Sequence, residues 1–99
     1  MILEFEDDDL HRLYTEPEFW LPWMGPDLTN QYRKKMGLIA SAPDERDLRA
    51  MRSLHLEKLE GDRKGQHSIR LNDQYRLIFR LRTGDDGRVA VVIEVVDYH

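Results

Sequence analysis

Cysteine is absent from the 99-residue sequence, which excludes a disulfide scaffold and thiol chemistry. The longest apolar stretch, Val89 to Val96, is interrupted by Glu94 and is far shorter than the ~20 residues of a membrane-spanning helix. No glycine-rich segment has the spacing of a phosphate-binding loop or a dinucleotide fingerprint. Internal repeats and low-complexity linkers are also missing, so function must be sought in scattered side chains.

The amino-terminal segment lacks the positive charge of a secretory signal, because acids occupy positions 4 and 6 to 9. We therefore expect a cytoplasmic protein with no membrane partner. The composition, 40% apolar and 34% charged, is that of a folded globular protein. A chain of this length predicts a single domain, residues 1–99, with a thin core.

Acidic and basic residues are unevenly distributed along the chain. Met1 to Gln31 has eight acids against Arg12 alone, whereas Arg52 to Arg82 has eight bases and four acids. These counts give −7 and +4 in a chain whose net charge is −4. A local basic patch can bind RNA despite an acidic total, although solvated charged faces explain the same counts.

The first half of the sequence predicts a short strand followed by helices. Ile2 to Phe5 is the strand, and a helix begins at Asp7 and ends before Pro17. A second helix starts at Pro26, and a third covers Asp44 to Met51. The apolar face of the second helix consists of Leu28, Tyr32, Met36 and Ile39.

The second half of the sequence predicts strands. Ser53 to Leu59 and Ser68 to Leu71 alternate between apolar and polar residues, and Val89 to Val96 is apolar enough for burial on both faces. Between them, Tyr75, Leu77, Phe79 and Leu81 share a core face, opposite Arg76, Arg80 and Arg82. The predicted architecture is an α+β fold with amino-terminal helices on one face of a twisted, mainly antiparallel sheet.

The carboxy-terminal half also contains the residue types needed to cleave RNA. A carboxylate, a phenol and a histidine follow the last strand as Asp97, Tyr98 and His99, and several arginines precede them. Metal-independent cleavage must activate a ribose 2′-hydroxyl, stabilise charge on phosphorus and protonate the leaving oxygen. Histidine and arginine suit these tasks, because imidazole titrates near neutrality and guanidinium binds two phosphate oxygens.

Four motifs in this half occur in a fixed order. They are Gly61-Asp62-Arg63-Lys64-Gly65, Ser68-Ile69-Arg70, Asn72-Asp73-Gln74-Tyr75-Arg76-Leu77 and Val96-Asp97-Tyr98-His99. The combination resembles the HigB branch of the RelE/ParE superfamily of toxins. Over the amino-terminal half, only the order of elements is similar.

The resemblance implies a RelE-like fold and a ribosome-dependent endoribonuclease, an mRNA interferase that cleaves translated mRNA without a cofactor or metal. It also implies a HigA-like helix-turn-helix antitoxin, with operator DNA contacted only through the toxin–antitoxin complex. In the family the terminal Asp-Tyr-His is catalytic, which corresponds to Asp97, Tyr98 and His99 here.

Five further residues are candidates for the same reaction. Arg76 is our candidate for stabilising the transition-state phosphate. The residues expected to position the RNA backbone or to contact ribosomal RNA are Arg63, Lys64, Arg70 and Arg80. Many family members carry a lysine before the GDR turn and a histidine three residues earlier, where this chain has Glu60 and Glu57. Glu57 is therefore a candidate proton acceptor.

Several of these features also have structural explanations. Terminal histidines are commonly frayed, and strand arginines are commonly solvated or paired with acids, as we expect for Arg82. His55 and His67 are candidate auxiliary bases, but a packed or edge-lying His67 is favoured by its parity with buried neighbours. The acidic cluster before Leu10 indicates a helix start rather than a metal site. Trp20 and Trp23 are expected in the core or facing a partner, rather than stacking on bases.

Two other functions remain open. A non-enzymatic toxin resembling the ParE branch would inhibit gyrase through protein contacts, although such a binder has no need of Asp97, Tyr98 and His99. A degenerate toxin acting only as an antitoxin-bound co-repressor would be compatible with Glu57 and Glu60.

Overall fold

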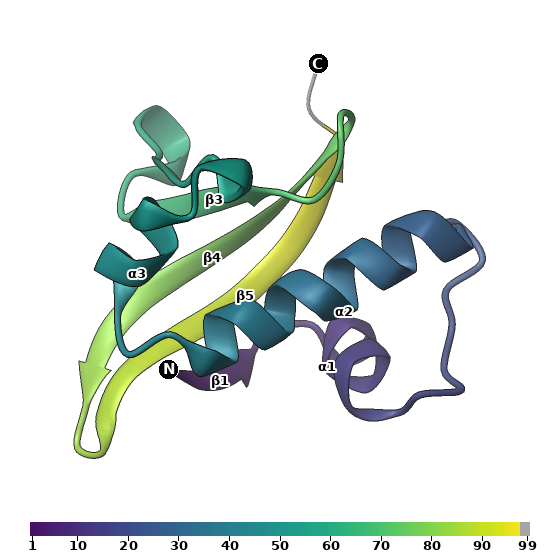
Figure 1. The fold of residues 1–99 in the computed structure, drawn as a ribbon, viewed down its shortest axis with the longest axis horizontal. Helices are drawn as coiled ribbons and strands as arrows, with labels where there is room; N and C mark the ends of the chain where they lie inside the picture. The colour runs from purple at the N-terminus through teal and green to yellow at the C-terminus, as the bar shows by residue number, and fades with distance from the viewer. Residues whose placement is uncertain (98–99) are drawn as a thin grey trace.

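A five-stranded mixed sheet forms the centre of the molecule (Figure 1). In the computed structural model, which describes residues 1–97, the strands lie in the order β1-β5-β4-β3-β2. Their bounds are β1 (Ile2–Phe5), β2 (Glu57–Lys58), β3 (Gln66–Arg70), β4 (Tyr75–Gly84) and β5 (Gly87–Asp97). β1 runs parallel to β5, and the remaining pairs are antiparallel. The predicted α+β fold with a mainly antiparallel sheet is confirmed.

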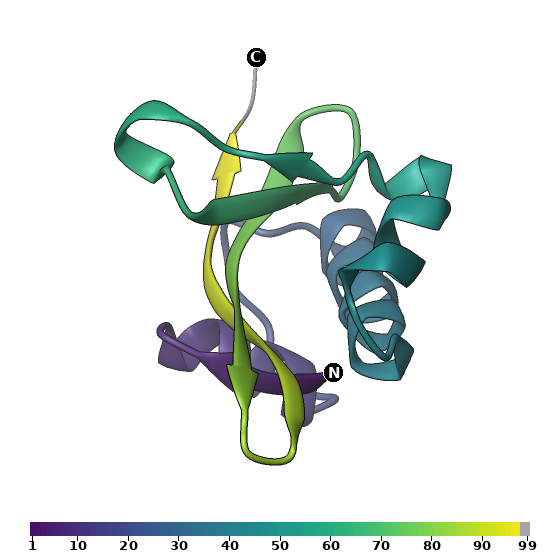
Figure 2. The ribbon, with the colours of Figure 1, turned by 90° about the vertical axis from the view of Figure 1, so that its left-hand side faces the viewer.

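Three helices accompany the sheet: α1 (Asp8–Thr15), α2 (Pro26–Ser41) and α3 (Glu45–Ala50). α2 and α3 lie on one side of the sheet (Figures 1 and 2), and α1 packs between α2 and β1. Asp7 and Asp44 cap the first and third helices by accepting backbone N–H bonds, and Pro26 opens the second. The three predicted helices are therefore confirmed nearly to the residue.

The core lies between α2 and the middle of the sheet. Tyr32, Met36 and Ile39 on α2 are fully buried, as are Phe79 on β4 and Val92 on β5. The Tyr32 hydroxyl donates to the carbonyl oxygen of Leu10 at 2.8 Å, which ties α2 to α1. The predicted apolar face of this helix is confirmed.

The predicted strand Ser53 to Leu59 is largely wrong. Arg52–Leu54 is a 3-10 turn, His55 adopts a left-handed conformation with φ 48°, and only Glu57–Lys58 pairs with β3. Leu54 is fully buried from within the turn. Leu54 is apolar because the turn buries it, and its spacing from Leu56 happens to match the alternation expected of a strand.

The predicted burial of the last strand on both faces holds only for its first half. Val89, Ala90 and Val92 are buried, whereas the residues from Ile93 to Val96 are half-buried. A bulge lies at Ile93, because Ile78 pairs with Glu94 while the next residue of β4 pairs with Val92. Side chains of a strand alternate between the two faces of the sheet. The extra residue shifts this alternation by one position, so the residues that face the core before the bulge and after it do not follow a single period of two.

Candidate functional site

The residues predicted to act on RNA converge at one end of the sheet. There the β3–β4 turn, the segment before β2 and the end of β5 lie together, at the top of Figure 1. A pocket of about 290 Å³ opens at this end. Its lining residues are His55, Arg70, Asn72, Asp73, Gln74 and Arg76.

Arg76 is the most constrained cation of this pocket. Its side chain is buried, with 7% of the residue exposed. Nε donates to Ser68 Oγ at 3.0 Å and Nη2 donates to the His55 carbonyl at 2.5 Å. Nη1 lies 3.6 Å from Glu57 Oε1. These contacts fix the orientation of the guanidinium, so the predicted cationic face is here an ordered, mostly buried site.

Arg70 lies directly opposite Arg76 in the β3–β4 pairing, so both side chains emerge on the same face. Arg70 Nε donates to the Asn72 carbonyl at 3.2 Å, and Nη2 forms an ion pair with Asp73. Like charges directly opposed across a pair of strands are destabilising. Asp73 beside Arg70 and Glu57 beside Arg76 offset part of this repulsion.

The turn that carries these arginines is held from two sides. Asn72 Oδ1 accepts from the backbone N–H of Gln74 at 2.9 Å and of Tyr75 at 2.7 Å. From α2, Lys35 Nζ donates to the carbonyls of Arg70 at 2.7 Å and of Leu71 at 2.9 Å. Burial lowers the pKa of Lys35, and the charge of Arg70 adds to this effect. No local pattern of residues predicts that Lys35 braces the turn.

Asp97 reaches the same end of the sheet from β5. It pairs with Tyr75, next to Arg76, and its Oδ2 accepts from Gln74 Nε2 at 3.0 Å. Gln74 therefore joins the carboxylate to the pocket. Tyr98 and His99, the other two residues of the predicted catalytic trio, lie outside the described residues.

Glu57 also belongs to this end of the sheet. It lies opposite Ser68 in the β2–β3 pairing, and its side chain is 49% exposed beside Arg76. The structure thus brings four of the predicted site residues to one end of the sheet: Glu57, Arg70, Arg76 and Asp97. Sequence reasoning missed Ser68 and Gln74, whose roles depend on cross-strand pairing.

The other predicted RNA-binding residues lie further along the sheet. Arg63 Nη2 contacts Glu94 Oε1 at 3.0 Å, and Lys64 is exposed beside the short 3-10 turn Gly61–Arg63. Arg80 and Arg82 form ion pairs with Glu6 and Glu4 of β1. Arg82 was expected to be solvated or paired with an acid, and the structure pairs it with Glu4. Arg63, Arg80 and Arg82 therefore each carry a carboxylate partner, as Arg70 and Arg76 do.

These β1 carboxylates are expected to weaken RNA binding by the intact protein. Replacing Glu4 and Glu6 with glutamine should raise the affinity for ribosomes at low salt, by up to about fivefold per pair, because exposed ion pairs are weak. The salt dependence of binding should steepen as Arg80 and Arg82 become available to phosphate. Filter binding across a salt series measures both effects. If the affinity and the salt dependence were both unchanged, the part of β4 that carries Arg80 and Arg82 would not face RNA.

His67 lies away from the pocket. Its ring stacks on Phe79 with centroids 5.9 Å apart, and its Nδ1 is buried with no hydrogen-bond partner among the described residues. Burial lowers its pKa, and the charge of Glu45 partly opposes this while Lys58, Arg49 and Arg88 add to it. The favoured explanation, a packed histidine, is confirmed.

The lowered pKa of His67 predicts a pH-dependent stability. The unfolded chain binds this proton at a higher pH than the folded chain, so stability is greatest above the ordinary pKa of ~6.5 and falls as the pH drops below it. His67→Phe keeps a ring against Phe79 and should flatten this slope. Urea denaturation at a series of pH values compares the two proteins. An equal slope in the variant would contradict the assignment.

Among residues 1–97, no cluster of three or more His, Asp or Glu side chains is placed to hold a metal ion. No helix of these residues is long and apolar enough to span a membrane.

Comparison with known sequences identifies relatives over most of the chain. Residues 3–99 match the family model described as the RelE-like toxin of type II toxin-antitoxin system HigB. Toxin HigB-1 of Vibrio cholerae is 39% identical over 80 residues, which is 81% of this chain and 83% of the relative. An uncharacterized protein of Haemophilus influenzae is 33% identical over 86 residues, which is 82% of this chain and 79% of the relative.

Solved structures share the fold at low sequence identity. A YoeB/ParE toxin from Agrobacterium tumefaciens superposes with a TM-score of 0.55 at 19% identity, covering 100% of both chains. A chain of the YoeB-YefM complex from Staphylococcus aureus superposes with a TM-score of 0.58 at 15% identity, covering 100% of this chain and 97% of that one. The predicted RelE-like fold is confirmed by these similarities.

Proposed function

Because the chain belongs to the HigB family of RelE-like toxins of type II toxin–antitoxin systems, we propose that it is a ribosome-dependent endoribonuclease that cleaves translated mRNA. The observation that carries the proposal is the pair of facing arginines, Arg70 and Arg76, beside Asp97. Such a pair suits a phosphodiester that gains negative charge in its transition state. We assign the whole chain, residues 1–99, to one catalytic domain.

In the proposed reaction the ribose 2′-oxygen attacks the adjacent phosphorus, and the bond from phosphorus to the 5′-oxygen breaks. A base takes the proton of the 2′-hydroxyl, and an acid protonates the leaving oxygen. Arg76 binds the phosphoryl oxygens, and its fixed guanidinium needs little reorganisation to do so. Arg70 holds the neighbouring backbone.

We assign the proton transfers to Glu57 and His99. Glu57 is half-exposed beside Arg76 and can accept a proton at the pocket edge. His99 is the candidate acid, Asp97 its charge-stabilising partner, and Tyr98 a stacking or hydrogen-bonding group, as the family motif implies. Arg63, Lys64 and Arg80 would contact RNA further along the sheet, in competition with the carboxylates that now pair with Arg63 and Arg80.

The proposed setting is the cytoplasm, where the translating ribosome positions the mRNA. A HigA-like helix-turn-helix antitoxin is the proposed inhibitor, and operator DNA is contacted only through the complex of the two proteins. The similarity to a chain of a YoeB-YefM complex supports the existence of a protein partner.

Mapping of mRNA 5′ ends by primer extension tests the proposal. Cells expressing the intact chain should show new cuts within translated frames, and cells expressing a chain without His99 should show none. Asp97→Asn should reduce the cuts while leaving the protein folded. Growth arrest without cuts would overturn the nuclease assignment in favour of a gyrase-type binder. Neither arrest nor cuts would indicate a co-repressor.

A further inference from the structure

The connection between α1 and α2 exposes aromatic surface that the proposed chemistry does not use. Trp20 is 67% exposed and Trp23 is 53% exposed, so of the two expected locations, the core or a surface facing a partner, the core is excluded. Tryptophan is depleted on free surfaces and is enriched at the centres of protein interfaces. The exposed indole of Trp20 therefore indicates a binding surface, whereas the Trp23 ring lies against that of Tyr75 with centroids 6.1 Å apart.

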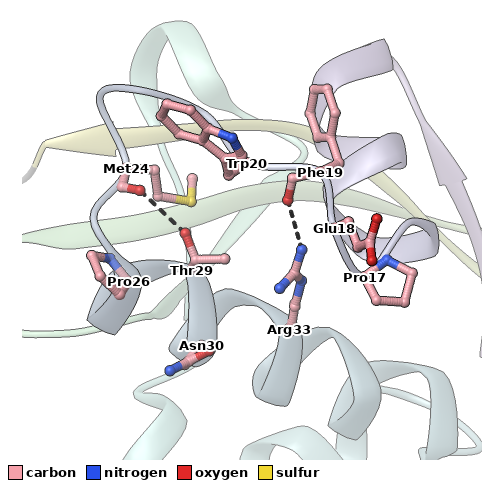
Figure 3. Close-up of a pocket in the computed structure, with 9 residues that line it drawn as sticks. All are labelled: Pro17, Glu18, Phe19, Trp20, Met24, Pro26, Thr29, Asn30 and Arg33. Carbon is pink, nitrogen blue, oxygen red and sulfur yellow. Dashed lines mark hydrogen bonds between the residues drawn. The ribbon is translucent and has the colours of Figure 1, made fainter.

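A pocket of about 320 Å³ lies beside Trp20 (Figure 3). Its apolar lining comes mostly from the connection, and its floor from the first turns of α2. The lining residues are Pro17, Glu18, Phe19, Trp20, Met24, Pro26, Thr29, Asn30 and Arg33. None of them lines the pocket at Arg76, and Trp23 lines neither. The two sites can therefore be mutated separately.

Hydrogen bonds from α2 fix the backbone around the pocket, in the last turn of α1 and in the connection. Arg33 donates from Nε to the Leu13 carbonyl and from Nη2 to the Phe19 carbonyl, both at 2.8 Å. Thr29 Oγ1 donates to the Met24 carbonyl at 3.2 Å (Figure 3). Because the connection is already ordered, a partner would bind without the entropic cost of fixing it.

The charge around the pocket selects the partner. Glu18 lines it, Glu16 lies at the adjoining depression, and Asp27 is exposed on the first turn of α2. The nearby cations are already engaged: Arg12 bonds to Glu16 and stacks over the Phe19 ring at 4.1 Å, and Arg33 bonds to carbonyl oxygens. Glu18 and Asp27 therefore give this surface an acidic character that would repel RNA and a second copy of the same surface.

We propose that this pocket binds a basic amphipathic segment of the antitoxin, with an apolar side chain in the pocket and lysine or arginine facing Glu18 and Asp27. The inference rests on the proposed function, because the partner is the antitoxin of that toxin. It adds where the antitoxin docks and by which chemistry. The docking surface contains none of the residues proposed to act on RNA.

Calorimetric titration with the full-length HigA-like antitoxin proposed above tests the inference. Trp20→Ala should weaken binding by roughly 30-fold, the size typical of a truncated interfacial tryptophan. Glu18→Lys should weaken it by roughly tenfold, with a smaller loss at high salt. Trp23→Ala, an exposed tryptophan of the same connection outside the pocket, is the matched control and should bind like the wild type. Thermal unfolding verifies that each variant folds.

Growth assays separate this inference from the proposed function. Trp20→Ala should still arrest growth and should escape neutralisation by co-expressed antitoxin. Equal antitoxin affinity for the wild type, Trp20→Ala and Glu18→Lys would overturn the docking site, whether or not the chain cleaves mRNA. Loss of ribosome binding or of self-association in Trp20→Ala, with antitoxin binding intact, would also overturn it. Absence of mRNA cleavage by the wild type would overturn the nuclease proposal alone, because the titration does not depend on cleavage.

Discussion

Replacing Arg76 with alanine is expected to lower ribosome-dependent mRNA cleavage by roughly 10²–10³-fold, the usual loss when a donor to the transition state is removed. The guanidinium is held by Ser68 and the His55 carbonyl and faces Glu57, so its orientation is set before substrate binds. Arg76→Lys keeps the charge but not the two-pronged geometry, and should recover only part of the activity. Single-turnover cleavage of mRNA on programmed ribosomes measures these rates.

Arg82→Ala is the matched control for this experiment. Arg82 lies on the same strand and face, is exposed, and pairs with Glu4. Its loss should leave the cleavage rate within a few-fold of wild type. Because alanine at position 76 leaves buried polar groups without their donor, thermal unfolding must be measured beside activity. A folded Arg76→Ala protein that cleaves at the wild-type rate would remove this residue from the mechanism.

Replacing Phe79 with alanine is expected to lower the free energy of unfolding by about 3–5 kcal/mol, the range for truncating a buried aromatic residue. Phe79 is fully buried at the centre of β4, where it contacts His67 and pairs with Val92 beside the bulge. Domains of this kind are stable by only ~5–15 kcal/mol, so one truncation removes a large share of the total. Urea denaturation followed by circular dichroism measures the change.

Ile2→Ala provides the comparison for Phe79→Ala. Ile2 is also an apolar strand residue, but it is 42% exposed on the edge strand β1. Its truncation should cost less than about 1 kcal/mol, because little apolar area is removed from the interior. Similar losses in the two variants would mean that the core does not lie where α2 meets β4.

The helices of this protein could be predicted from local sequence because their determinants are local. Asp7, Pro26 and Asp44 mark the starts, and the apolar spacing of α2 selects the face that is buried. The strand at Ser53 to Leu59 could not be predicted correctly, because Leu54 is buried by contacts distant in sequence while its neighbours form a turn.

The bulge in β5 was hidden for a related reason. Its apolar run is compatible with burial on two faces or with a change of parity, and only the pairing with β4 at Ile78 and Phe79 selects between them. The site shows the same division. Arg76 and Asp97 could be named from the sequence, but the partners that orient them, Ser68 and Gln74, could not.

The sequence by itself determined the charge asymmetry, the helices, the order of strands along the chain and the motifs that place this protein in its family. Only the tertiary structure decided which basic and acidic side chains meet. Strand pairing sets Arg70 against Arg76 and brings Glu4 and Glu6 to the arginines of β4, across separations of more than seventy residues for the latter pairs. Electrostatic partners depend on distance in space, which no local pattern of residues specifies.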